Sequence, residues 1–193
     1  GSASRTIEVQ VDKNAALYYY PQPVIPFAQS AFDSKMTIHL EDETSKLFLL
    51  EIISCGRNAH EERFQYRRFS SKVLLYRGEK LIYRDNTRYE PGKMPMEGIG
   101  LYEGFTHMAN LFLSKLCDRG DADGLDRTSE LKEKIWQILD EDSEVDGGVT
   151  RLTTGDLALR IFGHRAQKLQ QIAEKIKEIY TSCQINHKSV MNE

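Results

Sequence analysis

Apolar and polar residues alternate in short runs along the first 116 residues, and this pattern predicts a series of β-strands. About eight such runs follow one another at a spacing of roughly ten residues. They cover residues 7–11, 15–20, 36–40, 47–53, 63–69, 73–76, 81–83 and 109–116. Such a series is typical of an all-β sandwich, barrel or solenoid, and a solenoid would be irregular because no exact repeat is present.

The run over residues 47–53 differs from the others because it is apolar throughout, apart from Glu51. Its length is that of a strand, so we expect a strand with both faces buried. Gly56 ends it, and a polar loop over residues 57–62 leads into the next predicted strand, where Phe64 lies on one face. A charged loop between two apolar strands is a place where a scaffold displays functional groups.

Two other segments contain turn-forming or ladder-breaking residues. Residues 21–27 hold three prolines and predict an extended crossing segment, since proline has no N–H to donate to a sheet. Residues 77–80 include a glycine and indicate a hairpin turn between two short strands.

The spacing of apolar residues changes to that of a helix after residue 127. Residues 128–140 place their apolar side chains on one helical face, with Thr128 or Ser129 as the N-cap. The remaining predicted elements are strands over residues 145–154 and 156–162, joined at Gly155, and a helix over residues 164–180.

We therefore predict a mainly β fold, an irregular β-helical or stacked-sheet arrangement with two C-terminal α-helices that pack on a sheet. A chain of 193 residues fits one domain. We expect a strand-rich part over residues 5–116, a helix-strand-strand-helix part over residues 117–182, and a frayed tail over residues 183–193.

The composition excludes several classes of protein. Hydrophobic residues make up 40% and charged residues 28%, as in soluble globular proteins, and a net charge of -3 argues against nucleic acid as a partner. No apolar run is long enough to span a membrane, and no secretory signal is present. Cys55, Cys117 and Cys183 are far apart and form no CxxC pair, so we expect reduced thiols in a cytoplasmic protein.

The charges are distributed unevenly. Residues 57–88 contain nine Lys or Arg and four Asp or Glu, whereas residues 117–146 contain four and eleven. Two interpretations are open: two solvated faces, or a dipolar surface that orients partners during encounter.

No complete catalytic motif is present. The chain lacks a P-loop, a dinucleotide fingerprint, a nucleophile elbow and a paired-histidine zinc motif, so we expect a binding protein rather than an enzyme. Glu61 and Glu62 are neighbours, and neighbours in an extended segment point to opposite faces. His60, His107 and Cys55 do not have the spacing of zinc ligands.

Three segments resemble the UreD family of urease accessory proteins, which is called UreH in some bacteria. Residues 21–27, PQPVIPF, resemble the proline-rich motif of that family, and residues 51–64, EIISCGRNAHEERF, resemble its second motif. Residues 83–87 and 104–107 are similar to the UreH branch. The motif residues that we expect to shape the loops are Pro23, Pro26, Phe27, Gly56, Arg57, Glu62 and Phe64.

The chain departs from the family pattern in two ways. Glu61 stands where the family usually has glycine, so the loop there is expected to differ. Family members also carry a further N-terminal portion with strands of its own. We therefore expect a fragment whose first strand leaves an exposed sheet edge.

The resemblance implies a mainly β, helicoidal fold with two C-terminal helices and a non-enzymatic scaffold. Such proteins bind apo-urease and the accessory protein UreF, which recruits the GTPase UreG. The complex delivers nickel and helps to carbamylate the metal-bridging lysine of urease. The resemblance thus implies nickel in transit, through a water-filled route in the UreD-type protein, and no firmly bound cofactor.

The residues suggest where such a route and such partners would lie. Glu51, His60 and Glu62 are candidate weak ligands, because a path for a cation needs groups that also release it. The alternative is that Arg57 and Glu62 form a salt bridge that only holds the loop. For partner binding the candidate region lies between Asp118 and Tyr180, which offers acidic and apolar surface.

Two other functions stay open at this stage. One is a strand-rich protein-binding module unrelated to urease. The other is a β-helical enzyme that acts on polysaccharide, which would need a cleft with two carboxylates at working distance.

Overall fold

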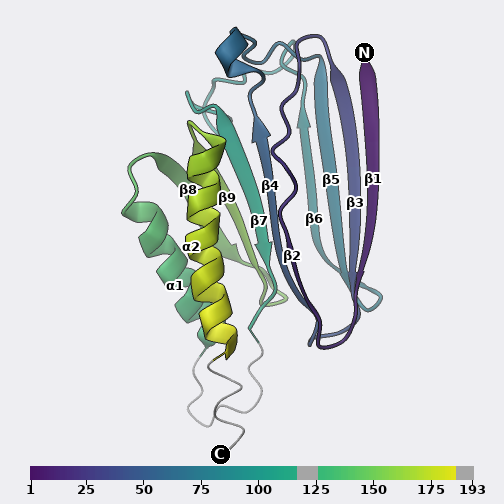
Figure 1. Cartoon of the computed structure of the whole chain (residues 1–193), viewed down its shortest axis with the longest axis vertical. Coiled ribbons are helices and arrows are strands. Elements are labelled where there is room, and N and C mark those ends of the chain that lie inside the picture. The colour runs from purple at the N-terminus through teal and green to yellow at the C-terminus, as the bar shows by residue number, and fades with distance from the viewer. Residues whose placement is uncertain (117–125, 186–193) are drawn as a thin grey trace, which may run out of the picture.

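The computed structural model describes residues 1–116 and 126–185, which form two mixed β-sheets and two α-helices (Figure 1). The strands are β1 (Ser2–Val11), β2 (Ala16–Tyr19), β3 (Ala31–Leu40), β4 (Lys46–Ser54), β5 (Arg68–Arg77), β6 (Lys80–Tyr89), β7 (His107–Leu113), β8 (Val145–Arg151) and β9 (Leu157–Gly163). The helices are α1 (Arg127–Asp140) and α2 (Ala166–Ile185).

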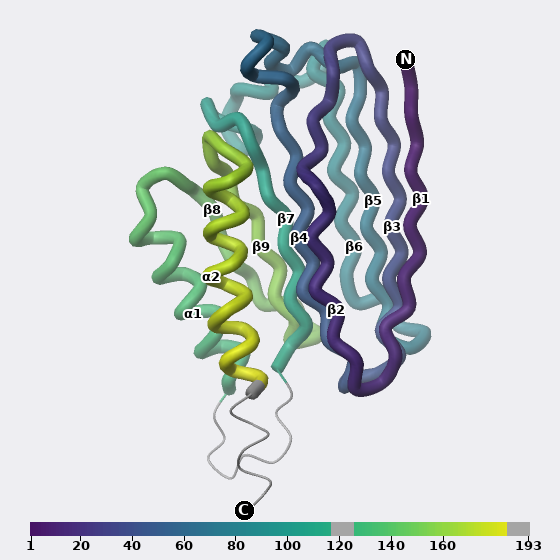
Figure 2. Tube along the Cα trace, viewed as in Figure 1, coloured from purple at the N-terminus to yellow at the C-terminus, as the bar shows by residue number. Residues whose placement is uncertain are grey.

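The first five strands alternate between the two sheets, as the tube in Figure 2 shows. Sheet A has the order β1-β3-β5-β6 and sheet B the order β2-β4-β7-β9-β8. The pairs β1–β3, β3–β5 and β2–β4 are parallel, so the chain coils with one strand in each sheet per turn. Antiparallel strands β6, β7, β9 and β8 then complete the sheets. The predicted mainly β fold, irregular β-helical with stacked sheets and two C-terminal helices, is confirmed.

Strand β4 is buried on both faces because it lies in the middle layer of three. Phe48 and Leu50 belong to the core between sheet B and the helices, while Leu47 and Leu49 belong to the core between the sheets. Burying each such side chain contributes about 1.5–3 kcal/mol. Glu51 interrupts this strand on the side that faces sheet A.

The predicted strand over residues 63–69 is wrong. Strand β5 begins only at Arg68, and the preceding residues form an irregular loop over the end of β4. Phe64 has a φ of +53°, and its N–H donates to the carbonyl of Cys55 at 2.6 Å. A left-handed residue breaks the alternation of faces, so the chain forms seven strands in residues 1–116 rather than eight. The hairpin at Gly78, with a φ of +57°, is confirmed.

The predicted N-cap of the first helix is also wrong. Asp126 occupies the cap, and its carboxylate accepts the N–H of Ser129 at 3.2 Å. Thr128 is buried instead, and its hydroxyl accepts the N–H of Leu116 at 3.3 Å. The sequence pattern does not identify Asp126 as the N-cap, because the Asp126 carboxylate and the hydroxyls of Thr128 and Ser129 could each accept the free N–H groups of the first turn.

Helix α2 packs its apolar face on sheet B. Ile172, Ile176 and Tyr180 are buried there, and the ring of Tyr180 lies 5.9 Å from that of Phe48. The helix continues to Ile185, so the first three residues of the expected tail are helical. Residues 186–193 lie outside the described part. Within the described residues, neither helix combines the length and the apolar character needed to span a bilayer.

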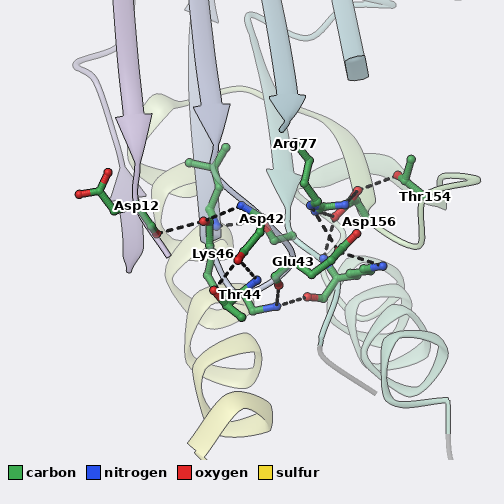
Figure 3. A network of polar contacts seen from close by, with 12 residues as sticks. Asp12, Asp42, Glu43, Thr44, Lys46, Arg77, Thr154 and Asp156 are labelled. Carbon is green, nitrogen blue, oxygen red and sulfur yellow. Dashed lines mark hydrogen bonds and ion pairs between the residues drawn. The ribbon is translucent and has the colours of Figure 1, made fainter. Parts of the chain in front are cut away.

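A polar network joins the sheets at the end opposite the loop that follows β4 (Figure 3). The buried carboxylate of Asp156 accepts from Arg77 at 2.7 Å, from the hydroxyl of Thr154 at 2.6 Å and from the N–H of Lys115 at 2.9 Å. Glu43 lies 3.4 Å from Arg77 and 3.1 Å from Lys115. Every oxygen of Asp156 therefore has a partner, as a buried carboxylate requires.

Candidate functional site

A row of polar side chains crosses the inner face of sheet B, where most neighbours are apolar. Strand register places Glu51 opposite Asn110 and Asn110 opposite Arg160, on β4, β7 and β9. The guanidinium of Arg160 donates to the Asn110 amide oxygen at 2.9 Å. From sheet A, Arg5 reaches within 3.8 Å of Glu51 and Asp85 within 3.2 Å of Arg160. We call these five residues the intersheet polar cluster.

Members of the cluster border two small cavities, one on each side of Glu51. The first, of about 20 Å³, is bordered by Arg5, Ser71, Glu51 and Asn110. The second, of about 10 Å³, is bordered by Asp85 and again by Glu51 and Asn110. Each offers room for about one water molecule beside polar partners. Glu51 is therefore the carboxylate that both cavities share.

Burial changes the acidity of Glu51. Removal from water raises its pKa from the ordinary 4.5 to about 7, the nearby charge of Asp85 adds to the rise, and Arg5 opposes it. The side chain keeps 17% of its surface exposed. A carboxyl group with this pKa exchanges protons near neutral pH, which is typical of functional groups in clefts.

The two loop motifs contact each other at the end of β4. Arg57 donates from Nε to Glu62 Oε2 at 2.8 Å, and the same oxygen accepts the N–H of Ala28 at 3.1 Å. The guanidinium also lies 4.5 Å from the ring centre of Phe27. The hydrogen bond from Arg57 is the main cause that lowers the pKa of Glu62, and the bond from Ala28 adds to it. Together they bring the pKa to about 2. The ion pair between Arg57 and Glu62, which was the alternative to a place for Glu62 on a metal route, is present in the structure.

Backbone geometry explains why glycine stands at position 56. Gly56 has a φ of +133°, and a Cβ there would lie 2.0 Å from the carbonyl oxygen of Glu62. Glu61, where the family usually has glycine, is itself left-handed with a φ of +60°. The residue type differs from the family pattern, but the backbone at position 61 still has the left-handed conformation that glycine adopts without strain.

The proline-rich segment lies beside β4 without forming a strand of its own. Val24 makes an isolated parallel bridge with Ile53, and its N–H donates to the carbonyl of Ile52 at 2.8 Å. Pro23 and Pro26 stand on either side and have no N–H to extend the ladder. The segment is the extended crossing that its prolines predict.

The three candidate metal ligands do not share one site. Glu51 lies in the intersheet polar cluster, Glu62 is paired with Arg57, and His60 ends an exposed 3-10 turn. In residues 1–116 and 126–185 no group of three or more His, Cys, Asp and Glu side chains could hold a metal ion. A transient route needs no such group, so these residues stay candidates for it.

Sequence reasoning missed Asn110, Asp85 and Arg160. Asn110 and Arg160 are polar residues of strands that are otherwise mostly apolar, as Arg160 is between Leu159 and Ile161, and both lie on the side of sheet B that faces sheet A. That interruption is the signal that singled out Glu51, and the same test applied to every strand finds Asn110 and Arg160. It does not find Asp85, because its neighbours Arg84 and Asn86 are polar. The test does not show that these residues lie next to one another in the fold.

The candidate partner-binding region between Asp118 and Tyr180 is only partly described. Residues 118–125 lie outside the described part of the chain. On α2 the apolar residues Ile172 and Ile176 are buried against sheet B, so that face is core and not interface. The exposed residues of the helix, such as Lys175 and Glu178, stay available for a partner.

Comparison with known proteins agrees with the motifs and the fold. The sequence model of the UreD urease accessory protein family matches residues 1–192. The urease accessory protein UreH of Helicobacter pylori (strain J99) is 32% identical over 181 residues, which cover 94% of this chain and 63% of that protein. The urease accessory protein UreD of Acetivibrio thermocellus is 32% identical over 181 residues, covering 93% and 64%.

The same similarity extends to more distant relatives. The urease accessory protein UreD of Haemophilus influenzae (strain PittGG) is 28% identical over 189 residues, 94% of this chain and 66% of that protein. The chain thus spans less than two thirds of the length of these curated relatives. The match along almost the whole chain shows that it belongs to the UreD family of urease accessory proteins.

Proposed function

We propose that this chain is a cytoplasmic, non-catalytic scaffold in urease maturation, which binds apo-urease and UreF and through UreF recruits UreG. The observation that carries the proposal is the family match over residues 1–192, together with relatives named urease accessory proteins. The fold supports it, because a two-sheet scaffold with long connecting loops offers surfaces for several partners.

The scaffold also assists nickel delivery, by a route that passes Glu51. This part of the proposal is supported by the two cavities on either side of Glu51 and by its pKa of about 7. A nickel ion can replace the proton of such a carboxyl, and one oxygen ligand among water molecules holds the ion weakly enough to release it. Glu62 and His60 would act at the loop end of β4, where Glu62 must first leave Arg57.

The test is urease activation at limiting nickel by purified complexes. We expect Glu51→Gln and Glu62→Ala to slow activation while leaving complex assembly intact. Glu8→Gln, on the exposed side of β1, is the matched control and should activate urease normally. Normal activation by both Glu51→Gln and Glu62→Ala would remove the route from the proposal.

Docking of UreF is tested separately, by substitution rather than deletion. Removing α2 would remove part of the core, so we choose the exposed residues Lys175 and Glu178. Reversing both charges should weaken co-purification with UreF if this face of α2 is the docking surface. Unchanged co-purification would move the search to the loops around Phe27 and Arg57.

A further inference from the structure

A surface depression lies next to the intersheet polar cluster, where sheet B extends past the edge of sheet A. Its volume is about 340 Å³, and it is lined by residues of β6, β7, β8, β9 and α1. Trp136 forms part of its wall and is 40% exposed, one of the few large apolar side chains on the described surface. Gly148 adds no side chain to the depression, which leaves it open.

The depression and the inner cavity beside Glu51 share two lining residues. Tyr83 and Asn110 border both, so the two spaces lie on either side of these side chains. Arg160 lines the depression and links two residues that border the inner cavity, with hydrogen bonds to Asn110 at 2.9 Å and to Asp85 at 3.2 Å. No other described basic side chain pairs with Asp85.

We propose that Arg160 is the gate between the surface depression and the Glu51 cavities, and that its release opens a polar path for small cations. The purpose of the gate rests on the nickel route proposed above. The gate itself can be tested on this chain without urease. Arg160 is a positioning residue in this scheme, not a ligand.

The chemistry of the two positions of Arg160 gives the gate its selectivity. In the closed position the guanidinium pairs with Asp85 and cancels its charge, so that the mouth offers a cation no unpaired carboxylate. Once it has swung out, Asp85 and Glu51 are two carboxylates on the path. The Arg160 side chain is 48% exposed and borders the same depression as Trp136, whose ring face can hold a released guanidinium.

The experiment measures access to the inner cavity with a cysteine placed in it. Val73 borders the cavity between Glu51 and Asp85 and is 2% exposed, so Val73→Cys puts a thiol there with little change in shape. We would follow labelling of this thiol by small methanethiosulfonate reagents, cationic and anionic, with peptide mass spectrometry to separate it from the native cysteines. Adding Arg160→Ala should speed labelling by about tenfold, which corresponds to removing a barrier of about 1.4 kcal/mol.

Three comparisons make the test specific. Leu75→Cys lies on the same face of β5, is fully buried and borders neither cavity, so Arg160→Ala should leave its labelling unchanged. Arg84 is an exposed arginine of β6, the strand that pairs with β5. Arg84→Ala should not speed labelling at Val73→Cys. The cationic reagent should react faster than the anionic one once Arg160 is removed.

The outcomes separate the gate from the urease role. Unchanged labelling at Val73→Cys, or an equal rise at Leu75→Cys, would overturn the gate, since the first shows no barrier and the second only a loosened core. Faster reaction of the anionic reagent would overturn the selectivity for cations. If the labelling results hold but Glu51→Gln and Arg160→Ala both activate urease normally at limiting nickel, the gate stands and the nickel route fails.

Discussion

Arg77 at the end of β5 and Asp156 just before β9 form a buried ion pair that joins the two sheets, although 79 residues separate them. Asp156 is fully buried and the Arg77 side chain is 7% exposed. We expect Asp156→Ala to lower the free energy of unfolding by about 3–5 kcal/mol, because the buried arginine loses its buried partner and keeps only the longer contact with Glu43. Urea unfolding followed by circular dichroism measures this.

The control for the ion pair replaces both partners. Arg77→Met combined with Asp156→Leu should lose less stability than the sum of the single variants, because no charge stays behind. Strictly additive losses would show that the two side chains act independently.

The second prediction concerns Gly56. Gly56→Ala should destabilise the fold by about 2–4 kcal/mol, since the new Cβ adds a clash to an unfavourable backbone conformation. Gly78→Ala is the matched control: its φ is also positive, at +57°, but a Cβ there would have 3.9 Å to its nearest neighbour. It should cost only about 1 kcal/mol. Equal losses for the two variants would rule out the contact with Glu62.

The third prediction is a gain of stability at Glu61. Its left-handed backbone, with a φ of +60°, costs energy for any residue that has a Cβ. Glu61→Gly should therefore raise the free energy of unfolding by about 0.5–1 kcal/mol, after the greater freedom of glycine in the unfolded chain is counted. Glu61→Ala retains the Cβ and should give no such gain. Thermal unfolding of the three proteins side by side decides the matter.

The fourth prediction follows from the raised pKa of Glu51. Between pH 4.5 and about 7 the folded protein holds a proton that the unfolded chain has released, so stability falls as the pH rises through this window. Glu51→Gln cannot ionise and avoids this loss. Relative to the wild type it should be about 2–3 kcal/mol more stable at pH 8 than at pH 5. An equal stability difference between Glu51→Gln and the wild type at pH 5 and at pH 8 would show that Glu51 is hydrated and has an ordinary pKa.

The pH dependence of stability has the opposite sign for Glu62, which serves as the comparison. Its pKa is lowered to about 2, so its contribution is present above pH 4.5 and disappears as the pH falls toward 2. Glu62→Gln should therefore lose stability relative to the wild type at neutral pH and approach it in acid. Opposite slopes for the two variants would separate a desolvated carboxyl from a paired one.

The loops show where local reasoning stops. Prolines marked the crossing at residues 21–27 correctly, because the lack of an N–H acts at each proline itself. The strand expected over residues 63–69 failed, because Phe64 takes a left-handed conformation that depends on its hydrogen bond to Cys55. The N-cap was misplaced for a similar reason, as Thr128 bonds to Leu116 and leaves the cap to Asp126.

The sequence by itself determined the two helices, the burial of β4 and all of the predicted strands except that over residues 63–69, because hydrophobic period is a local property that each segment carries. It also singled out Glu51 as a charge in an apolar strand. Only the tertiary structure decided that Glu51, Asn110 and Arg160 form one row. Strand register sets that row, and it depends on pairing between distant segments, such as those that hold Asn110 and Arg160, which are 50 residues apart. No local pattern encodes such a contact, because the side chains meet only after β4, β7 and β9 have paired.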